Sequence, residues 1–105
     1  MTLDPEDSKI ITLARAARAR NEAAEGAAVR DETGRTYSAT NVALSSLRLS
    51  AVQVAAAMAI SSGARSLEAV ALVTAVAPDP ADEAVAAELG VKALLVAGPD
   101  GTLRS

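Results

Sequence analysis

The segment 67–77 reads LEAVALVTAVA, a nearly continuous apolar run that is rich in β-branched residues. Such a strand has no polar face to turn toward water, so the run predicts a strand that is covered on both faces. A second buried strand is predicted over 91–97, after a short helix over 81–89. A strand–helix–strand unit of this kind favours parallel neighbours, and the pattern indicates an α/β domain with a layered sheet.

The rest of the chain predicts two further helices and a β-hairpin. Asp4 and Pro5 are typical of a helix start, because an acidic cap and a proline in the first turn suit the free N–H groups there. The turn at 31–34 (DETG) joins two short strands, with glycine supplying a positive φ. The expected order is α-β-β-α-β-α-β, in one domain over residues 1–105. The first four elements are a helix from Asp4 that ends before Gly26, strands over 27–30 and 35–42, and a helix from Ser50 that stops at 61–63.

Alanine occupies 26 of the 105 positions, Phe and Trp are absent, and Tyr37 is the single aromatic residue. A core of small aliphatic side chains buries less area per residue than a core with aromatic rings. We therefore expect additional burial through self-association.

Ten basic and thirteen acidic residues are mixed along the chain and give a net charge of −3, so nucleic acid is not expected as a partner. No leader segment and no apolar run of ~18 residues is evident, which predicts a cytoplasmic protein without a membrane contact. The sequence contains neither Cys nor His. Disulfides, thiolate chemistry and the commonest metal ligand and general base are thereby excluded.

Short motifs in a characteristic order resemble the cytidine deaminase family over nearly the whole chain. They are EGAAV at 25–29, ETGR at 32–35, ATNV at 39–42, SAVQ at 50–53, AISSG at 59–63, PADEA at 80–84, ELG at 88–90 and PDG at 99–101. The resemblance implies a three-layer fold with a mixed sheet that begins with an antiparallel hairpin. It also implies a zinc cofactor, hydrolytic deamination of a nucleoside and assembly as a dimer or a tetramer. Contacts between copies in the family include the helix that begins here at Ser50, and the small residues of the run Ala55–Ala57 would let two copies of this helix approach closely.

The chain departs from the family at the positions of the zinc ligands and of the Glu that moves protons. In the family, a first zinc ligand opens a C-A-E helix, two more lie in P-C-x-x-C, and the Glu of C-A-E moves protons between the zinc-bound water and the base. The corresponding positions are interpreted as Ser50 and Val52, followed by Ala81 and Ala84. Ala and Val cannot bind zinc, and a neutral Ser is a poor ligand. We therefore expect no zinc, no other metal and no catalytic residue.

The nucleoside pocket of the family also looks incomplete. Of the N-x-E motif that holds the ribose, Asn41 remains but Ala43 stands at the Glu position, and the aromatic pocket loop is shortened to 21–24. Asn41 is the one candidate substrate contact. The alternative is that its side chain satisfies backbone groups at the end of a strand.

Two other groups of residues have both a chemical and a structural interpretation. Ser50 could be a nucleophile, but no neighbouring base would activate it, so a helix N-cap is favoured. The acidic cluster Asp79, Asp82 and Glu83 could bind Mg²⁺ through oxygen atoms. Carboxylates that are stabilised by the dipole at a helix start are the favoured interpretation.

The sequence thus predicts a non-catalytic, cytidine-deaminase-like protein, either a pseudoenzyme or a self-associating structural or interaction module. A protein partner other than a second copy is not identified by any motif. The alternatives are a cytidine or nucleoside deaminase with a repurposed pocket and a sensor that binds a nucleoside without converting it.

Overall fold

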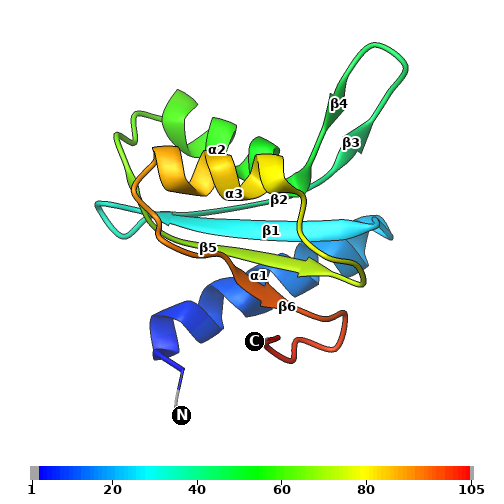
Figure 1. Ribbon diagram of the computed structural model, residues 1–105, viewed down its shortest axis with the longest axis horizontal. Coiled ribbons are helices and arrows are strands. Elements are labelled where there is room, and N and C mark those ends of the chain that lie inside the picture. Colours follow the sequence, from blue (N-terminus) through cyan, green and yellow to red (C-terminus); the bar gives the residue numbers. More distant parts are fainter. Residues whose placement is uncertain (1–2, 105) are drawn as a thin grey trace.

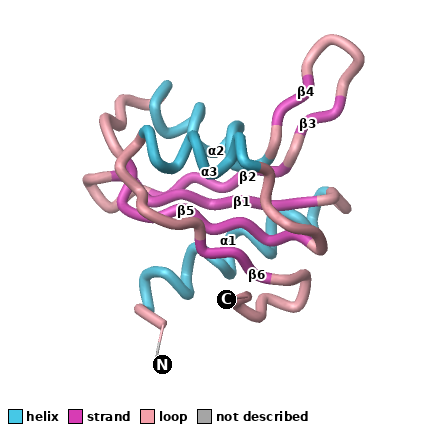
Figure 2. Tube along the Cα trace, viewed as in Figure 1, coloured by secondary structure: helices cyan, strands magenta, loops and turns pink. Residues whose placement is uncertain are grey.

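The computed structural model describes residues 3–104 and contains a four-stranded sheet between two layers of helices (Figures 1 and 2). This three-layer α/β architecture confirms the predicted fold class. The elements in chain order are α1 (Pro5–Asn21), β1 (Glu25–Asp31), β2 (Thr36–Thr40), β3 (Val42–Ala43), β4 (Arg48–Leu49), α2 (Ala51–Ser61), β5 (Leu67–Thr74), α3 (Pro80–Glu88) and β6 (Leu95–Ala97).

The main sheet is mixed and has the strand order β2-β1-β5-β6. β1 is antiparallel to both β2 and β5, with Val29 opposite Tyr37 and Ala28 opposite Ala71. β5 and β6 are parallel, as the strand–helix–strand unit predicted, and Leu72 lies opposite Val96. The hairpin that opens the sheet is confirmed, and a single parallel pair follows it.

Helix α1 covers one face of the sheet, and α2 and α3 cover the other (Figure 1). On the α1 side, Ile10 and Ala14 pack with Val73 in one buried cluster. On the opposite side, Val52 of α2 packs with Leu72 in the second cluster. Because both faces are covered, seven of the eight residues of β5 are buried. No helix in residues 3–104 has the combination of length and hydrophobicity needed to cross a bilayer.

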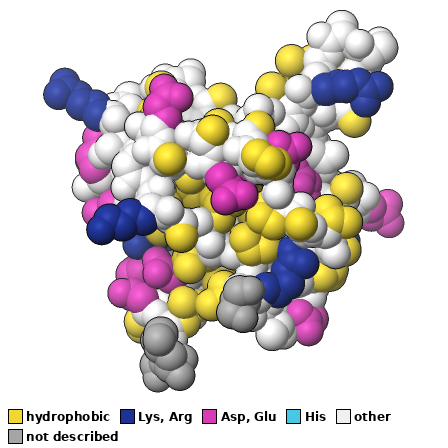
Figure 3. Space-filling view, viewed as in Figure 1, with side chains coloured by type: hydrophobic (Ala, Val, Ile, Leu, Met, Phe, Trp, Pro, Cys, Tyr) yellow, Lys and Arg dark blue, Asp and Glu magenta, His cyan; other side chains and the backbone are white. Residues whose placement is uncertain are grey.

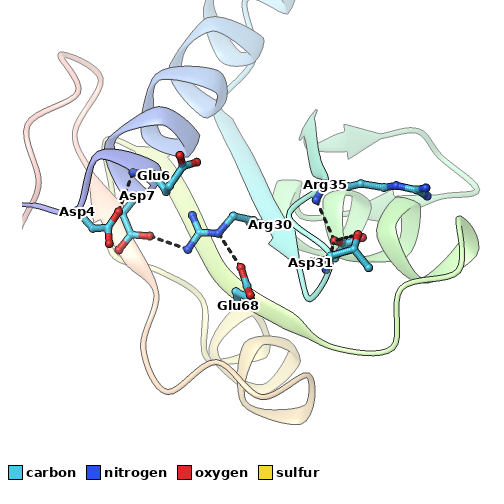
Figure 4. Close-up of polar contacts among 8 residues, drawn as sticks. Asp4, Glu6, Asp7, Arg30, Asp31, Arg35 and Glu68 are labelled. Atoms are coloured by element: carbon cyan, nitrogen blue, oxygen red, sulfur yellow. Dashed lines mark hydrogen bonds and ion pairs between the residues drawn. The ribbon is translucent and has the colours of Figure 1, made fainter.

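Local signals in the sequence account for the start of α1 and for the β1–β2 turn. Asp4 is the N-cap of α1, and its Oδ1 accepts a hydrogen bond of 2.8 Å from the Glu6 backbone N–H. In the turn, Oδ1 of Asp31 accepts hydrogen bonds from Thr33 and from the backbone N–H of Arg35, the latter drawn in Figure 4. Burial opposes ionisation of Asp31, but these hydrogen bonds prevail and lower the pKa of its carboxyl.

Arg30 of β1 joins the end of the sheet to α1. Its guanidinium donates to Asp7 of α1 over 3.1 Å and to Glu68 of β5 over 3.0 Å (Figure 4). The Arg30 side chain is only 15% exposed, so this pair of contacts is less screened by water than a typical surface ion pair. The contact with Asp7 therefore links α1 to the sheet.

Three predicted boundaries are wrong. The strand expected over 35–42 ends at Thr40, and the one expected over 67–77 ends at Thr74. The strand expected over 91–97 is limited to Leu95–Ala97. The apolar pattern continues past Thr74, but the pairing of β5 with β1 ends there, with Glu25 opposite Thr74. Val42 pairs with Leu49 outside the main sheet, and in the last segment only Leu95–Ala97 pair with β5.

The segment 42–49 forms a small hairpin, β3–β4, whereas the sequence predicted a connection over 43–49, after a strand that ended at Val42. Val42 pairs with Leu49, and the Leu44 N–H donates to the Leu47 carbonyl over 2.9 Å. The hairpin projects from the body of the molecule (Figure 1). Leu44 and Leu47 are 57% and 47% exposed. We refer to residues 42–49 as the arm.

Candidate functional site at the start of helix α2

Ser50 is the N-cap of α2, as the sequence predicted. Its Oγ accepts a hydrogen bond of 3.1 Å from the Gln53 backbone N–H, and Oε1 of Gln53 accepts one of 2.9 Å from the Ser50 backbone N–H. This reciprocal arrangement is a capping box, and it satisfies two N–H groups that the helix itself cannot pair. The N-cap interpretation of Ser50 is therefore confirmed.

The Ser50 hydroxyl also bonds to Asp82 in the first turn of α3. Ser50 Oγ donates to Asp82 Oδ1 over 2.5 Å, and Asp82 is only 1% exposed. Burial raises the pKa of the Asp82 carboxyl; the hydrogen bond from Ser50 acts in the opposite direction, and the charge of Asp79 adds to the rise. The two helices start at the same end of the sheet (Figure 1), and this one hydroxyl bonds to groups in both.

A second carboxylate reaches the same helix start from β1. Oε1 of Glu25 accepts a hydrogen bond of 2.9 Å from the backbone N–H of Ala51. Glu25 lies in the EGAAV motif, and no pattern in the sequence indicates this contact. No regular spacing relates residues 25 and 51, so only the packing of α2 on the sheet brings them together.

Asn41 lies between β2 and the arm, and its side chain makes a structural contact. Its Oδ1 accepts a hydrogen bond of 3.2 Å from the backbone N–H of Glu25. This contact agrees with the interpretation that Asn41 satisfies a backbone group at a strand end. A contact between Asn41 and a sugar stays a prediction.

The other predicted positions separate into a core residue and surface residues. Val52 is fully buried between α2 and the sheet, where it packs with Leu72. Ala81 and Ala84 are exposed, and the α3 side chain that bonds to Ser50 is that of Asp82. Asp82 and Ala86, one helical turn apart, are the buried residues of α3. The structure thus brings Ser50 together with Asp82 and leaves both alanines on the outer side of the helix.

The three carboxylates at the start of α3 also differ in exposure: Asp82 is buried, and Asp79 and Glu83 are exposed. Asp79 is the N-cap of α3, and its Oδ1 accepts a hydrogen bond of 2.8 Å from the Ala81 backbone N–H. Glu83 is exposed to solvent. These positions agree with carboxylates that stabilise a helix start. Within residues 3–104 no group of three or more carboxylates is arranged to hold a metal ion.

Comparison with known proteins identifies the class. A family model described as "cytidine deaminase-like" matches residues 3–101, and the chain therefore belongs to the cytidine deaminase-like family. No curated protein sequence matches the chain significantly.

Solved structures of cytidine deaminases superpose on this chain. The enzyme from Burkholderia pseudomallei does so with a TM-score of 0.76 at 28% identity, over 91% of this chain and 87% of that chain. The enzyme from Mycobacterium tuberculosis gives a TM-score of 0.74 at 26% identity, over 96% and 90% of the two chains. The enzyme from Mycobacterium leprae, at 23% identity with a TM-score of 0.72 over 96% and 93%, shows the shared fold alone.

The side chains at the start of α2 do not fit the zinc ion that the family implies. Zinc in proteins is held chiefly by Cys and His, and the sequence contains neither. The donors that the structure brings to this helix start are the Ser50 hydroxyl, the carboxyl of Asp82 and the carboxylate of Glu25, whose Oε1 accepts from the Ala51 N–H. A carboxyl must be ionised to bind a metal, whereas burial favours the protonated form of Asp82.

A surface groove lies elsewhere, along the outer sides of α2 and α3. Its volume is about 520 Å³, and its lining is mostly apolar. The lining residues include Ala56, Ala57, Ile60, Val85 and Leu89. The groove does not include Ser50, Val52 or Asp82, so it is separate from the positions at which the family places its chemistry.

Proposed function

We propose that this protein is a non-catalytic member of the cytidine deaminase-like family that acts as a self-associating structural or interaction module. The observation that carries the proposal is the buried hydrogen bond between Ser50 and Asp82, with Val52 in the core two residues further on. The proposal includes a cytoplasmic location and the absence of a zinc cofactor.

The chemistry of deamination supports this proposal. Hydrolytic removal of an amino group requires an activated water and a group that shuttles protons to the base. At the position that the resemblance assigns to the proton shuttle, the chain has the isopropyl group of Val52. The carboxylate of Glu25 is near this helix start, but its Oε1 is engaged by the Ala51 N–H. Neither Val52 nor Glu25 therefore both activates a water and shuttles a proton to the base.

The outer surface of α2 supports self-association. Met58 and Ile60 are 40% and 42% exposed, and Ile60 also lines the groove between α2 and α3. The sequence of α2 contains no charged residue, so a second copy of this helix could lie against it without burying a charge. Figure 3 shows further hydrophobic side chains on the arm, where Leu44 and Leu47 are exposed. We therefore propose that a second copy of this chain covers this surface.

An assay on the natural chain tests the absence of catalysis. The purified protein, supplied with zinc, is incubated with cytidine, and the formation of uridine and ammonia is measured over many enzyme equivalents. We expect neither product. Sustained turnover that the Ser50→Ala and Asp82→Ala variants lose would overturn the proposal, because it would place a working site at this helix start.

Thermal-shift measurements distinguish the module from a nucleoside sensor. Ligand binding at 100 times Kd stabilises a protein by about 2.7 kcal/mol, which raises Tm by several degrees in a domain of this size. We expect cytidine and uridine to leave Tm unchanged. A saturable rise without turnover would favour the sensor over the interaction module.

A further inference from the structure

We infer that the Ser50–Asp82 hydrogen bond has taken over the structural role of the family's metal ion, as the link that joins the starts of α2 and α3. The inference rests on the proposed absence of a metal from this site. Its tests measure stability and the metal uptake of variants, whereas the proposed function is tested by turnover. The inference can therefore fail while the proposed function stands, and the proposed function can fail while the inference stands.

The hydrogen bond between Ser50 and Asp82 is additional to the bonds that cap the two helices. α2 is capped by the Ser50 side chain and α3 by that of Asp79. Asp82 is therefore not needed as the cap of its own helix, and its Oδ1 is directed to the hydroxyl that caps the other. An ionisable side chain with 1% exposure is costly unless it has a partner. The partner that the structure provides is Ser50.

The separation of the two oxygen atoms distinguishes a direct bond from a metal bridge. Two oxygen ligands of one tetrahedral zinc ion, each about 2.1 Å from the metal, lie about 3.4 Å apart. Ser50 Oγ and Asp82 Oδ1 are 2.5 Å apart, the length of a short hydrogen bond to a carboxyl group. The two atoms are therefore at the separation of a direct hydrogen bond and not at the separation of two ligands of one ion.

The position of Asp82 also changes how the chain aligns with the family. The motif P-C-x-x-C places its two ligands one and four residues after the proline. Starting this motif at Pro78 puts Asp79 and Asp82 at the ligand positions, whereas starting it at Pro80 puts Ala81 and Ala84 there. The contact with Ser50 favours the first alignment. The second and third ligands would then have been replaced by an N-cap and by the residue that links the two helices.

A double-mutant cycle tests whether Ser50 and Asp82 are coupled. Tm is measured for Ser50→Ala, Asp82→Ala and the double variant. Each single change should lower Tm, and the double variant should lose clearly less than the sum, because both changes remove the same bond. The matched control combines Ser50→Ala with Asp4→Ala, whose effects should add, since Asp4 caps α1 on the opposite face of the sheet. Additive losses for Ser50 and Asp82 would overturn the inference.

Restoring metal ligands tests the alignment. The triple variant S50C/D79C/D82C should take up about one zinc ion per chain and give a thiolate absorption band with Co²⁺, and a chelator should lower its Tm. The control S50C/A81C/A84C has the same number of cysteines and should show much weaker uptake, because residues 81 and 84 are on the outer side of α3. Equal uptake by both, stronger uptake by the control, or no uptake by S50C/D79C/D82C would contradict the assignment of Asp79 and Asp82.

Discussion

The backbone carbonyl of Ala14 in α1 lies directly against Gly26 in β1. A Cβ atom at residue 26 would be 2.1 Å from that oxygen and 2.9 Å from Cβ of Arg18. Both distances are far below van der Waals contact, and the nearest atom belongs to the backbone, which cannot move aside as a flexible side chain can. The missing side chain at residue 26 therefore allows α1 to pack closely on the sheet.

Gly26→Ala should destabilise the protein by about 2 to 3 kcal/mol, because α1 must shift away from β1 to make room for the methyl group. Urea denaturation measures this loss. Gly98→Ala is the matched control, since a Cβ there meets Asp100 at an ordinary 3.5 Å, and it should change stability by less than about 1 kcal/mol. Equal effects of the two substitutions would refute the close approach of α1.

The buried carboxyl of Asp82 predicts a pH dependence of stability. Burial raises its pKa in the folded state, so its contribution to stability is fully present below the unfolded-state pKa of about 3.9 and is lost as pH rises through the folded-state value. Asp82→Asn cannot ionise. The variant should therefore gain stability relative to the natural chain as pH rises above the unfolded-state pKa of about 3.9.

Urea denaturation at a series of rising pH values measures the difference in unfolding free energy between Asp82→Asn and the natural chain. Taking the difference removes the effect of groups such as Asp31, whose lowered pKa acts in the opposite direction. Glu83→Gln, at an exposed neighbouring position, should show no comparable trend. A difference that stays constant with pH, or that favours the natural chain as pH rises, would show that Asp82 does not ionise with a raised pKa.

Val52→Glu would return a carboxylate to the position at which the family has its proton shuttle. Val52 is fully buried among aliphatic side chains, and an unpaired charge there should cost about 3 kcal/mol or more. Ala87→Glu, on the exposed side of α3, should stay within about 0.5 kcal/mol of the natural chain. A Val52→Glu variant as stable as the control would mean that a partner for the carboxylate already exists inside this site.

Self-association through α2 should depend on its exposed apolar side chains. The natural chain is expected to sediment as a dimer or a larger assembly, and Ile60→Arg should shift it toward monomer by introducing a charge into the proposed contact. Val76→Arg is the control, because Val76 is more exposed, at 66%, but follows β5 and is not part of α2. Analytical ultracentrifugation that finds only monomers of the natural chain over a wide concentration range would contradict the proposed assembly.

The sequence predicted the features that depend on neighbouring residues. Asp4 and Ser50 act as helix caps because each bonds to N–H groups two or three residues ahead. The β1–β2 turn follows from Asp31 and the glycine at residue 34, whose φ is 89°. The continuous apolar run of β5 predicted the cover on both faces, and the family resemblance implied three layers.

The features that the sequence did not predict depend on the packing of distant elements. Asp82 meets Ser50 across 32 residues, and Glu25 meets Ala51 across 26. No local pattern indicates which side of α3 faces α2, and a proline at both 78 and 80 allowed two alignments of one motif. The arm was missed because its strands are two residues long, too short to show an alternating pattern.

Zinc-edge anomalous diffraction from crystals grown with excess zinc tests most directly whether a hydrogen bond occupies the place of the metal. We predict no anomalous peak beside Ser50 and a separation of Ser50 Oγ from Asp82 Oδ1 within hydrogen-bond range. A strong peak from an ion that Asp79, Asp82 or Ser50 coordinates would contradict the account, as long as Ser50 Oγ and Asp82 Oδ1 had also moved apart to the spacing of two metal ligands.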